Sequence, residues 1–262
     1  MLEENKILIT WWNGRLWKAC KKIFPNAIYP SRKDMDITNP EMIKSFLGKK
    51  KPKYIIHLAA LASIPECEKN KDIAWEINVK STKNLVKISK EYWVEKFLYL
   101  QTACIFSWED APYNEYSIPN PKHYYGFTKV IAEEIIKSYN DDKFTTLIAR
   151  TNFTTMPWEY EKAFTDRFWT YLFAQWVAKG MKEFLEDNKW NQIIHICWDR
   201  KISMYEYATL GWSKVWKLTM WEYEWVCLTK DMSLITNNWH TYTIENSSFN
   251  DNEIQKCKKL NT

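Results

Sequence analysis

Short apolar runs alternate with longer amphipathic stretches over residues 1–150. The runs are typical of strands buried on both faces of a parallel sheet, and they lie at 6–10, 27–30, 54–60, 96–102 and 144–150. The stretches between them are typical of helices and extend to about residue 24, then over 40–47, 72–93 and 121–139. This alternation predicts an α/β fold, a Rossmann-type doubly wound parallel sheet with helices on both faces.

The pattern loosens after residue 150. Helical spacing is found at 164–185 and 203–210, a strand-like run at 192–197, and a polar tail from about Asp231. A chain of 262 residues fits one domain, or one domain with a smaller lobe attached. We therefore predict a first domain at 1–150 and a smaller C-terminal lobe at 151–262, interleaved with the first.

Composition excludes several classes of protein. Hydrophobic residues are 46% and charged residues 26% of the chain, so it is expected to fold rather than to be disordered. No apolar run approaches the roughly 18 residues of a membrane span, and the first ten residues do not resemble a secretory signal. The six cysteines are scattered without a CxxC pair, which favours free thiols in the cytoplasm and no metal site. The net charge of +5 is spread out, so no nucleic-acid partner is expected.

The first loop follows the strand at 6–10 and precedes a helix. At such a junction, helix N-terminal amides hold a dinucleotide pyrophosphate, and glycines allow the turn and the close approach. The loop reads T-W-W-N-G-R-L-W, in which Gly14 occupies one glycine position while Trp11 and Trp17 occupy the outer two. The alternative interpretation is a tryptophan-rich loop unrelated to nucleotides.

A second motif is Tyr-x-x-x-Lys on the helix predicted at 121–139. Tyr125 and Lys129 lie one turn apart and therefore on one helix face. A tyrosine beside a lysine can act as an acid whose pKa is lowered by the ammonium. Thr102 ends the strand at 96–102, at the edge where open α/β sheets bind ligands.

An ordered set of segments carries a family resemblance. The segments are T-W-W-N-G-R-L-W at 10–17, D-M-D-I-T-N-P-E at 34–41, K-P-K-Y-I-I-H-L-A-A at 51–60, I-N-V-K-S-T-K-N-L at 77–85, L-Q-T-A-C-I-F-S-W at 100–108, A-P-Y-N-E-Y-S-I-P-N-P at 111–121, Y-Y-G-F-T-K at 124–129, I-A-R-T at 148–151 and C-W-D-R-K-I-S-M-Y-E-Y-A at 197–208. Together they resemble the extended short-chain dehydrogenases/reductases, and among these the dTDP-4-dehydrorhamnose reductase group of nucleotide-sugar reductases. The resemblance covers residues 1–150 well and the remainder loosely.

The resemblance implies an NADPH- or NADH-dependent oxidoreductase acting on a nucleotide sugar. It makes 1–150 the dinucleotide-binding domain and 151–262 the substrate lobe. Tyr125 would protonate the sugar carbonyl oxygen as hydride arrives, Lys129 would hold the nicotinamide ribose, and Thr102 would bind the same oxygen as Tyr125. Arg167 is the residue expected near the substrate diphosphate. The other residues implied in cofactor binding are Trp11, Asn13, Gly14, Arg15, Leu16, Asp36, Ile37, Leu58, Ala59 and Ala60.

The charges that follow the second predicted strand indicate which cofactor is preferred. Sites that prefer NAD place an acid at the end of the second strand, where it binds the ribose 2′-hydroxyl. The corresponding stretch, Y-P-S-R-K at 29–33, has no acid and two cations. Ser31 and Arg32 would favour a 2′-phosphate, so NADPH is the expected cofactor. A solvated basic pair is the alternative.

Departures from the family pattern keep alternatives open. Ala103 and Cys104 replace the usual residues after the threonine, which argues against a dehydratase and makes a nucleotide-sugar epimerase the second hypothesis. Glu68 matches a family acid, but Pro65 replaces its companion, so the metal and dimer contacts of some relatives are not expected and homodimer formation stays open. A third hypothesis is a non-catalytic binding member that has lost the cofactor because of Trp11 and Trp17.

Tryptophan and glycine counts are both abnormal. The chain has 5 glycines and 16 tryptophans, whereas about 18 glycines are expected at this length. Trp93 stands where a helix C-terminus prefers a left-handed glycine, and Trp108 and Trp198 stand in turns that carry glycine in relatives. Six others lie among polar residues, a poor pattern for buried indoles: Trp169, Trp176, Trp212, Trp216, Trp221 and Trp225. We predict that most of the tryptophans are glycines in the natural protein, because a UGA codon meaning glycine was read as tryptophan. Trp158 and Trp239 stay open as genuine tryptophans, and the alternative is a protein that is truly rich in tryptophan.

Overall fold

Five parallel strands form the central sheet. The computed structural model describes residues 2–10, 14–107, 109–154, 158, 160–187, 192–210, 214–222 and 230–242. The strand order is β1-β2-β3-β4-β9, and every neighbouring pair is parallel. The strands are β1 Ile7–Thr10, β2 Tyr54–His57, β3 Lys96–Thr102, β4 Thr145–Thr151 and β9 Ile193–Ile196. Because helices cover both faces, these runs are apolar almost throughout, and the predicted Rossmann-type sheet is confirmed.

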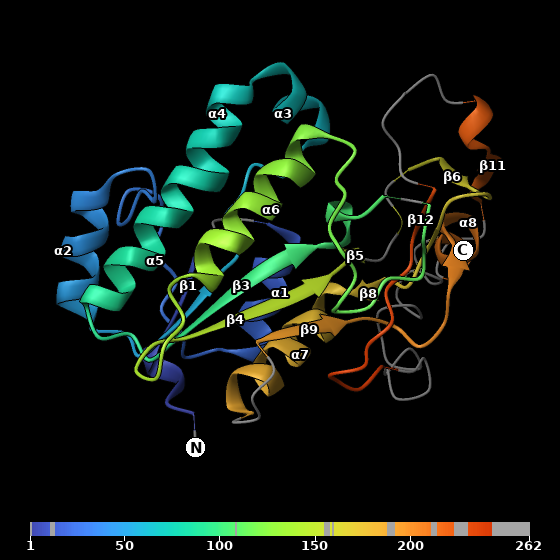
Figure 1. Ribbon diagram of the computed structural model, residues 1–262. Helices are drawn as coiled ribbons and strands as arrows, with labels where there is room; N and C mark the ends of the chain where they lie inside the picture. Colours follow the sequence, from blue (N-terminus) through green and yellow to red (C-terminus); the bar gives the residue numbers. More distant parts are fainter. Residues whose placement is uncertain are drawn as a thin grey trace.

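Two helical layers enclose the sheet, as Figure 1 shows. One layer holds α2 Pro40–Lys50, α3 Ile64–Lys69, α4 Lys71–Trp75, α5 Ser81–Glu91 and α6 Tyr124–Lys137. The other holds α1 Arg15–Ile23 and α7 Ala174–Glu186, which pack against each other. Asn39 caps α2 by accepting from the amides of Glu41 and Met42, with Pro40 at the first helical position.

The helix predicted at 72–93 contains a wider turn in its middle. A π-helical segment, Glu76–Lys80, joins α4 to α5. Such segments are frequent at functional sites. Asn78 within it is buried, accepts from the amide of Leu61 at 2.7 Å and donates to the hydroxyl of Thr128 at 3.0 Å. The π segment thereby fixes the loop after β2 against α6.

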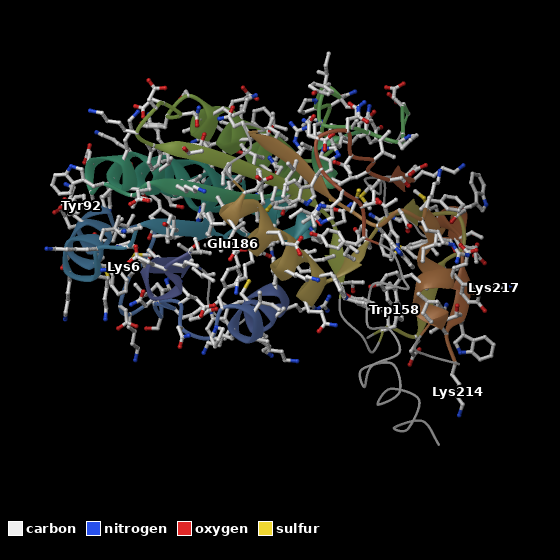
Figure 2. All side chains as sticks on the ribbon, turned by 90° about the horizontal axis from the view of Figure 1, so that it is seen from below. Lys6, Tyr92, Trp158, Glu186, Lys214 and Lys217 are labelled. Atoms are coloured by element: carbon white, nitrogen blue, oxygen red, sulfur yellow. The ribbon has the colours of Figure 1, made fainter. Side chains whose placement is uncertain are left out.

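After residue 151, the elements outside the central sheet and α7 are short, and we refer to this region as the C-terminal lobe. It contains β5 Phe153–Thr154, β6 Lys162–Phe164, β7 Phe168–Trp169, β8 Leu172–Phe173, β10 Ile202–Ser203, α8 Met204–Thr209, β11 Trp216–Leu218 and β12 Asp231–Met232. The described residues also form three short 3₁₀ turns: Glu4–Lys6, Ala103–Ile105 and Met220–Glu222. Figure 2 shows Trp158, Lys214 and Lys217 in this lobe, at the end of the molecule remote from Lys6 and Tyr92. Among the described residues, no helix has both the length and the apolar character required to cross a bilayer.

Two predicted elements differ in the structure. Residues 27–30 make only an isolated parallel bridge, Ile28 with Leu8, and form no strand. The helix predicted at 164–185 begins at Ala174, and the residues before it form β6, β7 and β8. Strands of two or three residues are too short to establish a period of two, so the helical spacing that follows dominates the pattern.

The tryptophans fall into two environments. Trp93 has φ 58°, in the left-handed region predicted for a glycine cap, and its side chain is 84% exposed. Trp169 and Trp176 are buried, so the expectation that their surroundings suit buried indoles poorly is wrong. Both belong to the hydrophobic core that contains residues of α1, α7 and the short strands, and its apolar residues come from separate elements. Trp216 and Trp221 are exposed, and Trp11, Trp108, Trp212 and Trp225 lie outside the described residues.

Candidate active site

Two cavities of about 270 Å³ each open at the carboxyl ends of the central strands. Ala60, in the loop after β2, lines both, so the cavities are neighbours on either side of this residue. The first cavity is lined by Thr10, Pro30, Arg32, Met35, Asp36, Ile37, Thr38, Ala59, Ala60, Leu61 and Ile77. The second is lined by Gly14, Arg15, Leu16, Trp17, Leu58, Ala60, Ala62, Leu100, Gln101, Thr102, Cys104, Tyr125, Lys129, Thr151, Asn152, Phe153 and Tyr171.

The N-terminus of α1 faces the second cavity. Gly14 is its N-cap in an extended conformation and, having no side chain, makes no side-chain capping bond itself. Gly14, Arg15 and Leu16 line the cavity, so the first amides of a nine-residue helix are presented where a pyrophosphate could accept from them. Trp11 and Asn13, also predicted to bind the cofactor, lie outside the described residues.

Trp17 occupies part of this cavity wall. Its ring meets the ring of Tyr29 edge to face at 5.6 Å, and the ammonium of Lys21 lies 4.1 Å from the ring centre. The indole N–H is buried without a hydrogen-bond partner. An indole therefore fits here at the cost of an unsatisfied donor, whereas a glycine would leave the wall open.

The loop after β2 is tied to the end of β1. The hydroxyl of Thr10 accepts from the amides of Leu58 and Ala59 at 3.2 and 3.3 Å, and it bonds to the ring of His57 at 2.8 Å. Leu58 lines the second cavity, Ala59 the first, and Ala60 both. The structure thus brings all three predicted loop residues to the site. Thr10 was missed, although its place at the carboxyl end of a strand could have identified it.

Charged side chains lie at the outer end of the first cavity. Arg32 and Asp36 both line it and form an ion pair at 2.9 Å. Burial acts to raise the pKa of Asp36, but the amide of Thr38 and the guanidinium of Arg32 hold it below its usual value. Ser31 donates instead to Asp34 at 2.6 Å and does not line the cavity. The stretch at 29–33 has no acid of its own, but the turn after residue 30 brings Asp36, which was itself predicted to bind the cofactor, beside Arg32.

Thr102, Tyr125 and Lys129 all line the second cavity, as predicted from their places on β3 and α6. Lys129 donates to the carbonyl of Leu100 at 2.8 Å. Burial lowers the pKa of Lys129 to about 7, against the opposing charge of Glu133. Burial also raises the pKa of Tyr125, with the Cys104 thiol adding to the effect. The net direction is opposite to the lowering expected from a neighbouring ammonium, because desolvation of the phenol dominates.

Residues from the lobe side complete the second cavity. The amide oxygen of Asn152 accepts from the amide of Ala103 at 3.2 Å and from the hydroxyl of Thr102 at 3.4 Å. Tyr171 stacks on Trp169 with ring centres 3.6 Å apart. Sequence reasoning missed both Asn152 and Tyr171. Asn152 could have been found because it follows the carboxyl end of β4, but Tyr171 lies between two short strands and gave no signal.

Arg167 lies near the second cavity but does not line it. Its guanidinium is 3.9 Å from the sulfur atoms of both Met204 and Met232. Its charge acts on Cys104 and Tyr171, lowering the pKa of each against the larger effect of burial. Glu68 accepts from the amide of Tyr124 at 2.6 Å and so caps α6. No cluster of potential metal ligands occurs in the described part of the chain.

These features define a nucleotide-binding α/β enzyme fold with a tyrosine-lysine site. Residues 4–196 match the model of the NAD dependent epimerase/dehydratase family. The chain belongs to this family, and the resemblance stated from the sequence is confirmed.

Individual relatives support the same placement. The chain is 30% identical over 156 residues to a GDP-6-deoxy-D-talose 4-dehydrogenase and 26% identical over 155 residues to a dTDP-4-dehydrorhamnose reductase, both from Aggregatibacter actinomycetemcomitans. The matches cover 56% and 57% of this chain but only 52% and 51% of these relatives. The structure of a dTDP-4-dehydrorhamnose reductase from Clostridium acetobutylicum is similar with a TM-score of 0.78 and 25% identity, covering 87% of this chain and 89% of that one.

Proposed function

We propose that the protein is an NAD(P)H-dependent reductase of a nucleotide-linked 4-keto sugar. The observation that carries this proposal is that Thr102, Tyr125 and Lys129 line one cavity, which has a second cavity as its neighbour across Ala60. A dinucleotide is long and needs two neighbouring sites on either side of a phosphate-binding helix terminus. The start of α1, with Gly14 as its N-cap, supplies that terminus.

The described residues suit such a cofactor. Ile37, Met35 and Ile77 give the first cavity an apolar wall for an adenine ring, and Arg32 stands at its outer end. Gly14 to Leu16 offer amides for the pyrophosphate. The cofactor, when bound, supplies the hydride. We propose NADPH over NADH because Arg32 can still offer its terminal N–H groups to a 2′-phosphate while its Nε pairs with Asp36.

Tyr125 is placed to donate a proton. Because burial raises its pKa, the phenol keeps its proton at neutral pH. It gives that proton to the carbonyl oxygen of the sugar as the carbonyl carbon is reduced, and a hydroxyl group results. Thr102 would donate its hydroxyl proton to the same oxygen, in place of the long 3.4 Å bond that it makes to the amide oxygen of Asn152. Lys129, with a pKa near 7, exchanges protons readily at the pH at which the reaction runs.

An epimerase is the second candidate. Ala103, directly after Thr102, is buried and offers no acid or base for water elimination. The experiment is to bind NADPH to the purified chain, measured by a shift in melting temperature, and then to supply a panel of dTDP- and UDP-linked 4-keto sugars. Net oxidation of NADPH supports the reductase. Interconversion of sugar epimers without net oxidation supports the epimerase, and absence of binding supports the non-catalytic hypothesis.

A further inference from the structure

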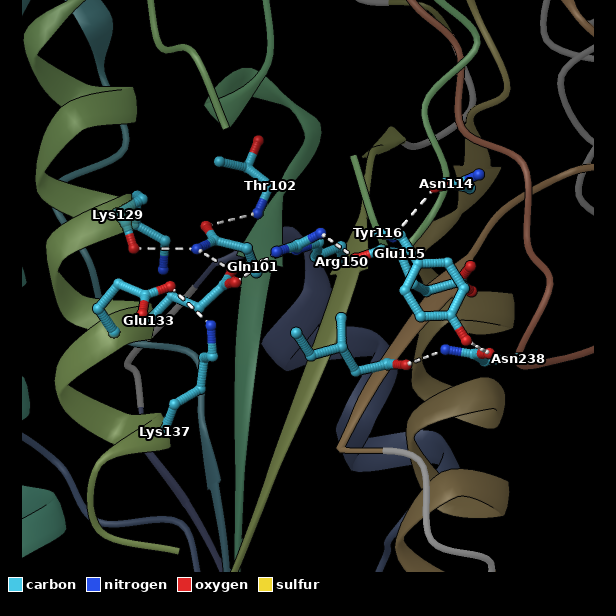
Figure 3. A network of polar contacts seen from close by, with 12 residues as sticks. Gln101, Thr102, Asn114, Glu115, Tyr116, Lys129, Glu133, Lys137, Arg150 and Asn238 are labelled. Atoms are coloured by element: carbon cyan, nitrogen blue, oxygen red, sulfur yellow. Dashed lines mark hydrogen bonds and ion pairs between the residues drawn. The ribbon is translucent and has the colours of Figure 1, made fainter. Parts of the chain in front are cut away.

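A buried polar network runs from the second cavity into the C-terminal lobe (Figure 3). Glu133 lies one turn after Lys129 on α6, and its carboxylate pairs with the guanidinium of Arg150 at 2.5 Å. Arg150 also donates to the backbone carbonyl of Glu115 at 3.2 Å. The carboxylate of Glu115 accepts from the amides of His195 and Asn237 at 3.0 Å each. Charges taken out of water in this way require partners, and here each has them.

Gln101 connects this network to the proposed catalytic groups. Its amide nitrogen donates to the carbonyl of Lys129 at 2.9 Å and to the carboxylate of Glu133 at 2.8 Å. Its amide oxygen accepts from the backbone amide of Thr102 at 2.9 Å. Figure 3 shows the side chain lying between α6 and the end of β3. The side chain is buried and bonded through both of its polar atoms.

We propose that Gln101 is a positioning residue, which holds Thr102 on β3 and Lys129 on α6 at a fixed separation for the reduction. The proposal rests on the proposed function. A primary amide keeps both a donor and an acceptor on one planar group, whatever the pH. A carboxylate would lose the donor, and an apolar side chain would lose both. A misplacement of about 1 Å between reacting groups can cost on the order of 100-fold in rate.

The surroundings of Lys129 make it a sensitive reporter of this arrangement. The titratable and charged groups that face it come from four elements: His57 on β2, Tyr99 on β3, Tyr125 and Glu133 on α6, and Arg150 on β4 through Glu133. A carboxylate introduced at position 101 would add a negative charge between Lys129 and Glu133. Such a charge favours the protonated lysine.

The test uses Gln101→Met, which is close in size and lacks both polar atoms. Its control is Gln192→Met, because Gln192 donates to Thr146 at 2.7 Å and has no bond to Thr102 or Lys129. We expect Gln101→Met to slow single-turnover hydride transfer by about 10- to 100-fold while the Kd for NADPH changes by less than about threefold. Gln192→Met should keep the wild-type rate. A folded Gln101→Met protein with the wild-type rate would overturn the proposal.

A second variant, Gln101→Glu, tests the proposal if Gln101→Met does not fold. Gln101→Glu keeps the acceptor for Thr102, and its carboxyl can donate only while protonated. We expect the rate to approach wild type at low pH and to fall as the introduced carboxyl ionises. A pH profile identical to that of wild type would contradict the role of Gln101.

The readout that does not depend on activity is the titration of Lys129 in ¹³C-lysine-labelled protein, with Lys129→Arg to assign the signal. The Lys129 pKa should rise in Gln101→Glu and stay unchanged in Gln192→Met. If the wild-type chain does not bind NADPH, the proposed function fails. The titration then still decides whether Gln101 is coupled to Lys129, and an unchanged value in Gln101→Glu would overturn the proposal.

Discussion

The ammonium of Lys129 lies 3.8 Å from the centre of the Tyr99 ring, enclosed between α6 and β3. This cation–π contact and the bond to Leu100 offset only part of the desolvation of the charge. The lysine therefore has a pKa of about 7 in the folded protein against 10.5 for the exposed group.

Stability should follow the titration of this lysine. Between pH 7 and 10.5 the unfolded chain binds a proton that the folded chain does not, so the lysine makes stability rise with pH in this window. Lys129→Met removes the effect and leaves Glu133 paired with Arg150. We expect this variant to be more stable than wild type at pH 7 by on the order of a few kcal/mol, with a smaller difference near pH 10.

Urea unfolding at pH 7 and pH 10 measures the difference. Lys137→Met is the control on the same helix, because Lys137 makes only a surface pair with Glu134. Its effect should stay below about 1 kcal/mol at both pH values. If Lys129→Met is no more stable than wild type at pH 7, then burial of the Lys129 charge does not destabilise the folded protein.

The proton donor is tested by Tyr125→Phe. Removal of the phenol hydroxyl should lower turnover by on the order of 10²–10⁴, with NADPH affinity nearly unchanged. Tyr124→Phe is the matched control, since Tyr124 precedes it on α6 and does not line the second cavity. Steady-state turnover and NADPH binding are measured on both. Turnover preserved in Tyr125→Phe would exclude the proposed proton transfer.

Cofactor choice is tested by Arg32→Ala. Loss of the guanidinium should raise the Kd for NADPH by about tenfold. The Kd for NADH should stay equal or fall, because Asp36 is released to accept from a ribose hydroxyl. Lys33→Ala is the control, since Lys33 is exposed and does not line the first cavity. Equal losses for both cofactors would show that Arg32 does not contact a 2′-phosphate.

Close packing at the start of α6 gives a prediction on stability. A Cβ at Gly126 would meet the backbone carbonyl of Cys104 and would lie 2.9 Å from the Cβ of Pro121. Gly126→Ala should therefore destabilise the protein by roughly 1–3 kcal/mol, measured by urea unfolding. The control is Gly48→Ala on α2, where the added Cβ would meet only the ring of Tyr92 at 3.3 Å. If both variants have equal stability, α6 does not pack as described.

The sequence predicted the central sheet well because its strands are buried on both faces. A run such as Ile7–Thr10 is recognised as a buried strand from its own residues. The partners of the strand in the sheet need not be known for this prediction. Thr102, Tyr125 and Lys129 were found because strand ends and helix spacing place side chains by local geometry alone. Gln101 and Tyr171 were missed because their roles depend on contacts with α6 and Trp169, and such partners are set by tertiary packing.

Several tryptophans occupy positions that suit glycine better than an indole. Trp93 has φ 58°, which costs a residue with a Cβ about 1 kcal/mol or more. Its side chain is 84% exposed and gains little from burial. Among the described residues, the buried indole nitrogen of Trp17 has no hydrogen-bond partner. Trp158 differs, because it is buried and donates to the carbonyl of Lys162 at 3.3 Å, as a native tryptophan would.

We therefore predict that most of the 16 tryptophans are glycines in the protein from its natural source, where UGA would encode glycine. The intact mass of that protein should be far below the value for this sequence, and peptide sequencing should find glycine at 93 and tryptophan at 158. As a second measurement, Trp93→Gly in the present chain should raise stability by about 1 kcal/mol, whereas Trp158→Gly should lower it. A native mass that matches 16 tryptophans would refute the codon explanation. Trp17 would then be a true part of the cavity wall, and the non-catalytic hypothesis would gain support.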